Sequence, residues 1–180
     1  VFSIMTRAPQ HIYQILTKRP DRMERWFKEN DWLKDRCDRW NEGWPPPFLW
    51  LGVSAENQKM ADARIPVLAQ IPAAVRFVSV EPMLGPVNVR KWLANPHECN
   101  CSAPGGIHSA SCLEDVPLSW VIIGGESGPN YREMKVEWLE DIVEQCQAAG
   151  VPVFVKQASH RFPGQQGNIP DRLWRLKEFP

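Results

Sequence analysis

The chain alternates between short apolar runs and longer amphipathic segments. The apolar runs are rich in β-branched residues and have the length of buried strands; they cover residues 12–16, 48–53, 75–80, 120–123 and 151–155. Four of them are followed directly by a polar or charged residue, Thr17, Ser54, Glu81 or Lys156, where a strand would give way to a loop. The pattern predicts five strands that are buried in the interior of the domain.

Segments between the runs have helical periodicity. The first begins at Pro20, which suits the first turn of a helix, and its apolar stripe predicts one helix that ends by Gly43. A second helix is predicted over residues 58–70, with a kink at Pro66. A third is predicted before Gly150, with an apolar stripe formed by Trp138, Leu139, Ile142, Val143 and Cys146. The stripe places the Cys146 thiol in the core, where it should be inert.

Strands that alternate with helices indicate a parallel sheet. A complete eight-unit barrel takes about 250 residues, so three architectures fit this chain: a partial barrel, a doubly wound sheet or a piece of a larger barrel. We expect an α/β fold with about five parallel strands, in a single domain of residues 1–180 with an insert at residues 94–117. The chain begins with Val1 rather than Met, so we expect a processed product or a fragment.

Composition narrows the function classes. Lys and Arg together number 21, as do Asp and Glu, so the formal net charge is +0 and a general polyanion-binding role is disfavoured. Five cysteines at uneven spacing do not resemble the disulfide framework of an extracellular domain. No apolar run approaches the roughly 20 residues that cross a bilayer. We therefore expect a cytoplasmic protein without a membrane partner.

Polar residues follow every apolar run at the same structural phase. The carboxyl ends of parallel strands share one edge, where ligand sites form. The ionisable residues gathered there would be Lys18, Glu56, Glu81, Glu126 and Lys156. Neighbouring carboxylates should raise at least one pKa, with the lysines compensating. The three glutamates and Lys156 are therefore the candidate catalytic residues, for proton transfer or for holding a polar ligand.

Other residues at the same edge are candidates for binding a cofactor. These are Thr17, Lys18, Ser54, Asn57, Ser79, Gly124, Gly125, Ser127 and Gln157. The two glycines would let a ligand approach the backbone closely. The alternative interpretation is that these side chains pair with one another across a solvated edge or cap the following helices.

Five motifs occur along the chain in a fixed order. They are LTKRP at 16–20, WLGVSAEN at 50–57, FVSVEPMLGPV at 77–87, WVIIGGESGP at 120–129 and QCQAAGVPVFVKQ at 145–157. With the closing DRLWRLKEFP, the chain resembles a phage-associated family of uncharacterised proteins that are similar to radical S-adenosylmethionine enzymes. The resemblance covers essentially the whole chain. It implies a partial parallel β/α barrel and, for the intact protein, S-adenosylmethionine and a [4Fe–4S] cluster as cofactors.

The resemblance also implies roles for the residues at the strand ends. Ser54, Glu56, Ser79, Glu81 and Glu126 would bind the amino, carboxylate and ribose groups of the cofactor, or the substrate, while Lys18 and Lys156 would neutralise carboxylate or phosphate charge. Members of the family usually carry three clustered cysteines near the N-terminus as cluster ligands, and this chain has none before Thr17. The resemblance therefore implies that the chain is truncated at the N-terminus. A nucleotide or nucleic-acid substrate is suggested by the phage association, by analogy alone.

A second group of chemically active residues lies in the predicted insert. It contains His97, Cys99, Cys101, His108 and Cys112. Thiolate and imidazole suit Zn²⁺, so Cys99, Cys101, His108 and Cys112 are candidate zinc ligands. Their spacing matches no standard zinc finger, and the alternative is a solvated loop with free thiols or a local disulfide.

Two further functions fit the same residues. One is a β/α-barrel hydrolase in which two of the three glutamates act as acid and base. The other is a non-catalytic module that binds nucleic acid or another protein.

Overall fold

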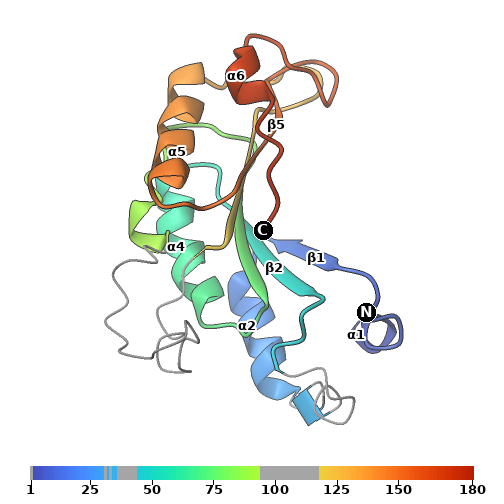
Figure 1. Ribbon diagram of the computed structural model, residues 1–180. Helices are drawn as coiled ribbons and strands as arrows, with labels where there is room; N and C mark the ends of the chain where they lie inside the picture. The colour runs from blue at the N-terminus through green and yellow to red at the C-terminus, as the bar shows by residue number, and fades with distance from the viewer. Residues whose placement is uncertain (1, 31, 33, 36–43, 94–117) are drawn as a thin grey trace.

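The computed structural model describes residues 2–30, 32, 34–35, 44–93 and 118–180 (Figure 1). The helices of the described residues are α1 (Phe2–Met5), α2 (Pro20–Glu29), α4 (Gln58–Ala69), the short 3₁₀ helix η1 (Arg90–Trp92), α5 (Val136–Ala148) and α6 (Asp171–Trp174). The strands are β1 (Tyr13–Thr17), β2 (Leu49–Ser54), β3 (Val75–Val80), β4 (Trp120–Gly124) and β5 (Val153–Gln157). No described helix is long and apolar enough to cross a membrane.

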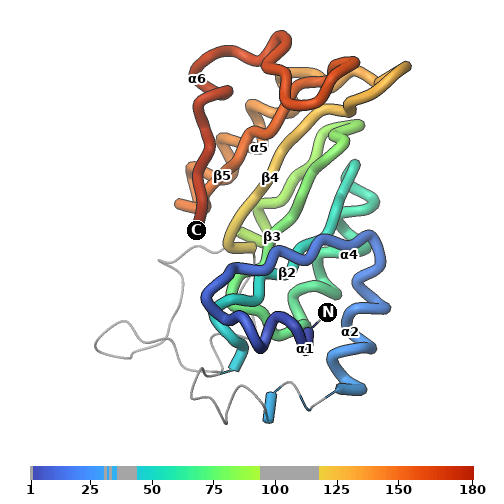
Figure 2. The backbone as a smooth tube through the Cα atoms, turned by 90° about the vertical axis from the view of Figure 1, so that its right-hand side faces the viewer, coloured from blue at the N-terminus to red at the C-terminus, as the bar shows by residue number. Residues whose placement is uncertain are grey.

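All five strands form one parallel sheet in the order β1-β2-β3-β4-β5. Figure 2 shows the strands side by side, and in Figure 1 helices α2, α4 and α5 lie on the same side of them. A doubly wound sheet would reverse its strand order and carry helices on both faces. The sequential order therefore confirms the predicted partial β/α barrel.

The two faces of the sheet have different partners. Leu49, Leu51 and Val53 of β2 belong to the core cluster that the helices cover, as do Val78 and Val80 of β3. Side chains alternate between faces along a strand, so the intervening residues point to the opposite side, which we call the inner face. Trp50, Phe77 and Trp120 form a second apolar cluster there. Burying each of these rings stabilises the fold by about 1.5–3 kcal/mol.

The end of the chain covers the amino-terminal half of the inner face. Phe179 packs on Trp120 and Phe154, with ring centroids 5.2 and 5.4 Å apart, and the Trp120 indole N–H donates to the Glu178 carbonyl at 2.8 Å. The same segment pairs with the outer edge of β5, since the amide of Val155 donates to the carbonyl of Leu176. The apolar half of the inner face is thus closed.

Local signals explain two of the helices. Asn57 caps α4 by accepting a hydrogen bond from the Met60 amide at 3.1 Å, and the helix continues through Pro66. Helix α5 ends before Gly150, whose φ of +66° suits glycine, as predicted. Cys146 lies fully buried on its core face, and burial raises the pKa of its thiol to about 12.

The predicted extent of the first helix is wrong. Helix α2 ends at Glu29, because Asn30 leaves the helical conformation (ψ 62°) and its side chain donates to the Trp26 carbonyl at 2.7 Å. Leu33, Cys37 and Trp40, which extended the apolar stripe, lie outside the described residues.

Candidate functional site

The carboxyl ends of the five strands meet beyond the apolar half of the inner face. Seven polar side chains from four strands define what we call the polar mouth: Lys18, Ser54, Glu56, Ser79, Glu81, Lys156 and Gln157. Direct contacts join Lys18 to Glu56, and Glu81 to both Lys156 and Gln157. The sheet therefore brings together predicted residues that lie far apart in the sequence.

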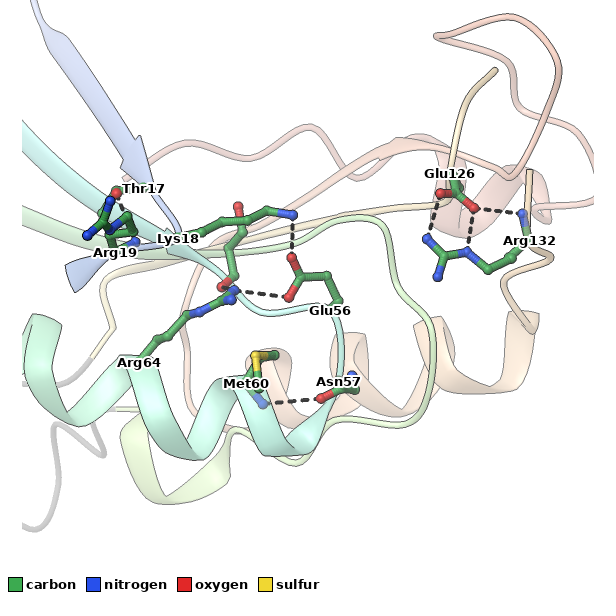
Figure 3. A network of polar contacts seen from close by, with 10 residues as sticks. Thr17, Lys18, Arg19, Glu56, Asn57, Met60, Arg64, Glu126 and Arg132 are labelled. Carbon is green, nitrogen blue, oxygen red and sulfur yellow. Dashed lines mark hydrogen bonds and ion pairs between the residues drawn. The ribbon is translucent and has the colours of Figure 1, made fainter. Parts of the chain in front are cut away.

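Glu56 is held by two cations (Figure 3). Lys18 Nζ lies 2.5 Å from Oε1, and Arg64 Nη1 lies 3.0 Å from Oε2 and donates to the Ser54 carbonyl at 2.7 Å. Burial alone would raise the pKa of Glu56, but the hydrogen bond from Lys18, a backbone hydrogen bond and the charge of Arg64 together lower the pKa. Glu56 is thus a fixed anion at neutral pH.

Two residues of β5 hold the carboxylate of Glu81. Lys156 Nζ lies 3.0 Å from Oε2, and Gln157 Nε2 donates to Oε1 at 3.0 Å. Gln157 is buried and also donates to the carbonyl of Gly125 and accepts from the amide of Gly164. Gly124 leaves room for the glutamate, since a Cβ there would lie 3.1 Å from Glu81 Cδ.

Glu126 pairs outside the polar mouth. Arg132 donates to it three times, through its backbone amide, Nε and Nη2, at 2.7–2.8 Å. These bonds lower the pKa of Glu126 to about 2. Figure 3 shows this pair apart from the network of Lys18, Glu56 and Arg64. A general acid needs a raised pKa, so neither Glu56 nor Glu126 suits that role in the alternative glutamate hydrolase.

The Glu126–Arg132 pair predicts a pH dependence of stability. The pKa of Glu126 falls from 4.5 to about 2 on folding, so its contribution is present above pH 4.5 and is lost as the pH falls towards about 2. We expect the difference in melting temperature between the wild type and Glu126→Gln to shrink over that range. Calorimetry at several pH values measures it, and a difference that stays constant down to pH 2 would contradict the assignment.

Two serines of the polar mouth are buried next to each other. Ser54 and Ser79 are partners in the register between β2 and β3, and both point to the inner face. They are only 5% and 2% exposed. Within the described part of the chain neither hydroxyl has a hydrogen-bond partner, although buried polar groups almost always have one. This pair is the strongest sign of a ligand site.

Several of the predicted cofactor-binding residues have local structural contacts. The Thr17 hydroxyl accepts from the Arg19 amide, the Asn57 side chain caps α4, and Ser127 is exposed and pairs through its backbone with His160. Gly125 lets another segment of the same chain approach closely, in place of the predicted ligand. A Cβ at this position would lie 2.2 Å from the backbone nitrogen of Ser159.

Sequence reasoning missed Arg64, Arg132 and Ser159. Arg64 reaches Glu56 from the second turn of α4, and Arg132 comes from an irregular loop. Ser159 is buried, accepts from the Met134 amide and donates to the Arg132 carbonyl. Of these three residues, only Arg64 could have been found from the sequence, because it lies in the predicted helix that begins just after Glu56.

The zinc prediction lies outside the described residues, which exclude Cys99, Cys101, His108 and Cys112. Among the residues that the structure describes, no three His, Cys, Asp or Glu side chains form a group that could hold a metal ion. Cys146, the one cysteine in that part of the chain, is a buried thiol and does not suit a cluster ligand.

The described residues form a parallel β/α half-barrel, and polar side chains gather at the carboxyl ends of its strands, which is the edge where ligand sites form in this architecture. The chain belongs to the family described as protein of unknown function (DUF5131), whose model matches residues 1–169. Comparison with curated proteins and with solved structures finds no match. The family description names no activity, so the phage association and the likeness to radical S-adenosylmethionine enzymes stay predictions.

Proposed function

We propose that the polar mouth binds S-adenosylmethionine and that the chain forms part of a radical S-adenosylmethionine-like enzyme. The observation that carries the proposal is the pair of buried hydroxyls, Ser54 and Ser79, at the ends of the same strands that are followed by Glu56 and Glu81, two carboxylates that cations hold in place. This arrangement suits a small molecule with several hydroxyls and charges of both signs.

The chemistry of the mouth matches the groups of this ligand. Lys18 and Lys156 would hold its carboxylate, Glu81 its ammonium group, and the two serines its ribose hydroxyls. When bound, S-adenosylmethionine supplies a sulfonium centre whose carbon–sulfur bonds are the reactive ones. The residues of this chain bind and orient it and exclude water from the apolar side of the site.

Charge also favours a ligand that carries an anionic group. Around the strand ends, the ion pairs comprise four cationic side chains, Lys18, Arg64, Arg132 and Lys156, and three carboxylates, Glu56, Glu81 and Glu126. Lys18 and Lys156 are more than half exposed, so each can reorient towards a ligand. The described residues do not fit a [4Fe–4S] cluster, and no step of the proposal passes through one.

Titration calorimetry with S-adenosylmethionine tests the proposal. We expect the wild-type chain to bind, and Ser79→Ala to weaken binding about twofold to tenfold, because one hydrogen bond contributes about 0.5–1.5 kcal/mol. Ser54→Ala should act similarly. Ser127 is an exposed serine at the same edge. Ser127→Ala is therefore the matched control and should bind like the wild type.

Two results would refute the proposal. One is the absence of any heat of binding with the folded wild-type chain. The other is binding that is unchanged when both Ser54 and Ser79 are replaced by alanine, since the ligand would then lie elsewhere.

A further inference from the structure

Three aromatic side chains lie next to one another beyond the ends of β4 and β5. The rings of Tyr131 and His160 are nearly parallel, with an interplanar angle of 19° and centroids 6.4 Å apart, and the His160 and Phe162 centroids are 6.0 Å apart. We call Tyr131, His160 and Phe162 the aromatic rim. Phe162 is 60% exposed. Tyr131 and His160 are partly exposed, and aromatic side chains that cluster at a surface often mark a binding site.

Backbone hydrogen bonds hold this rim in place. The amide of His160 donates to the Glu126 carbonyl at 3.0 Å, and the amide of Gly128 donates to the His160 carbonyl at 3.1 Å. The pairing of β4 with β5 therefore continues past the strand ends. The His160 ring is fixed as well, because its Nδ1 accepts from the Phe162 amide at 3.0 Å. A site that is organised before binding loses less entropy when a ligand arrives.

A positive charge accompanies the rings. The Arg161 guanidinium lies 5.8 Å from the Phe162 ring, and no carboxylate of the described residues forms an ion pair with it. Arg132 is 62% exposed beside Tyr131, although Glu126 neutralises it. Arg161 is thus an exposed cation that is available to a ligand.

Aromatic faces beside arginine are the features that bind single-stranded nucleic acid, through stacking on bases and attraction of phosphates. We infer that the aromatic rim binds a single-stranded nucleic acid, with bases on Tyr131 and Phe162 and a phosphate at Arg161. Duplex is a poor fit, because its bases already stack on one another. Three rings are also too small a patch for a stable protein interface, which buries at least about 1,000 Å².

The aromatic rim and the polar mouth both lie at the carboxyl edge of the sheet. The two proposals about them can nevertheless be tested independently. Gln157 joins them, since it contacts Glu81 on one side and the loop at Gly164 on the other. The inference uses no residue of the proposed S-adenosylmethionine site. Failure of one proposal therefore leaves the other standing.

Fluorescence anisotropy with a labelled single-stranded oligonucleotide of mixed sequence tests the inference. We expect the wild-type chain to bind, and Phe162→Ala and Tyr131→Ala each to weaken binding about fivefold to a hundredfold, as for the loss of one base stack. Tyr131→Phe keeps the ring and should bind like the wild type. Arg161→Gln should reduce the slope of log affinity against log salt concentration by about 0.7.

The control is Phe179→Ala, which removes a phenyl ring of matching exposure (58%) near the amino-terminal ends of β4 and β5, away from the aromatic rim. Its binding should equal that of the wild type, with circular dichroism verifying that every variant is folded. The inference is overturned if the wild type does not bind, if the ring variants bind as tightly as the wild type, or if a duplex of the same length binds equally well.

Discussion

Replacing Gly125 with alanine is expected to lower the free energy of unfolding by about 3 kcal/mol. The added Cβ would lie 2.2 Å from the Ser159 nitrogen and 2.6 Å from the Ala158 carbonyl carbon. Both are backbone atoms, so a change of rotamer cannot relieve the overlap. Any shift of this segment would also disturb the Gln157 backbone that pairs with the Gly125 amide. Urea denaturation followed by circular dichroism measures the loss.

Gly85 offers a matched control for this substitution. It also lies in a loop that follows a strand, but a Cβ there would approach no closer than 4.0 Å to Asn57 Cβ. We expect Gly85→Ala to change the free energy of unfolding by no more than about 0.5 kcal/mol. Equal losses in the two variants would show that close packing at Gly125 is not the cause.

Phe77→Ala should destabilise the fold by about 3–5 kcal/mol. Phe77 is 1% exposed in the centre of the inner-face cluster, so its removal leaves a cavity between Trp50 and Trp120. Its ring occupies the space that Gly52 leaves on β2, where a Cβ would lie 2.3 Å from a ring carbon. Gly52→Ala alone should therefore cost about 1–3 kcal/mol.

The double variant distinguishes this packing from a general weakening of the sheet. Once Phe77 is alanine, the clash at Gly52 is gone, and Gly52→Ala should cost little. We expect the double variant to be more stable than the sum of the single effects by about 1–3 kcal/mol. Equilibrium denaturation of the four proteins measures this coupling, and simple additivity would contradict the proposed contact.

Much of the fold could be predicted from hydrophobic periodicity. The runs that predicted strands lie within two residues of the observed ones at both ends, and α4 and α5 appear where their stripes placed them. The end of α2 could not be predicted in this way, because the apolar stripe continues past Asn30. There the side-chain hydrogen bond to Trp26 competes with the helix.

The edge of the sheet at which the candidate residues gather could be predicted from the sequence. The partners of the glutamates could not. Parallel strands bring their carboxyl ends together, so Lys18, Glu56, Glu81 and Lys156 could be expected at one edge of the sheet. Which cation would neutralise each glutamate depends on tertiary packing: Arg64 comes from a helix and Arg132 from a loop. These partners lower the pKa of Glu56 and of Glu126, where sequence reasoning expected mutual repulsion of the carboxylates.

The two edges of the sheet differ in whether an additional strand can pair with them. The segment around Lys177 pairs antiparallel with Phe154 and occupies the free side of β5, whereas β1 has a strand neighbour on one side alone in the described part of the chain. An additional strand could thus extend this sheet most directly beside Tyr13–Thr17. If it ran parallel, its last residues would arrive next to Lys18, and a partner that donates such a strand would add side chains to the polar mouth.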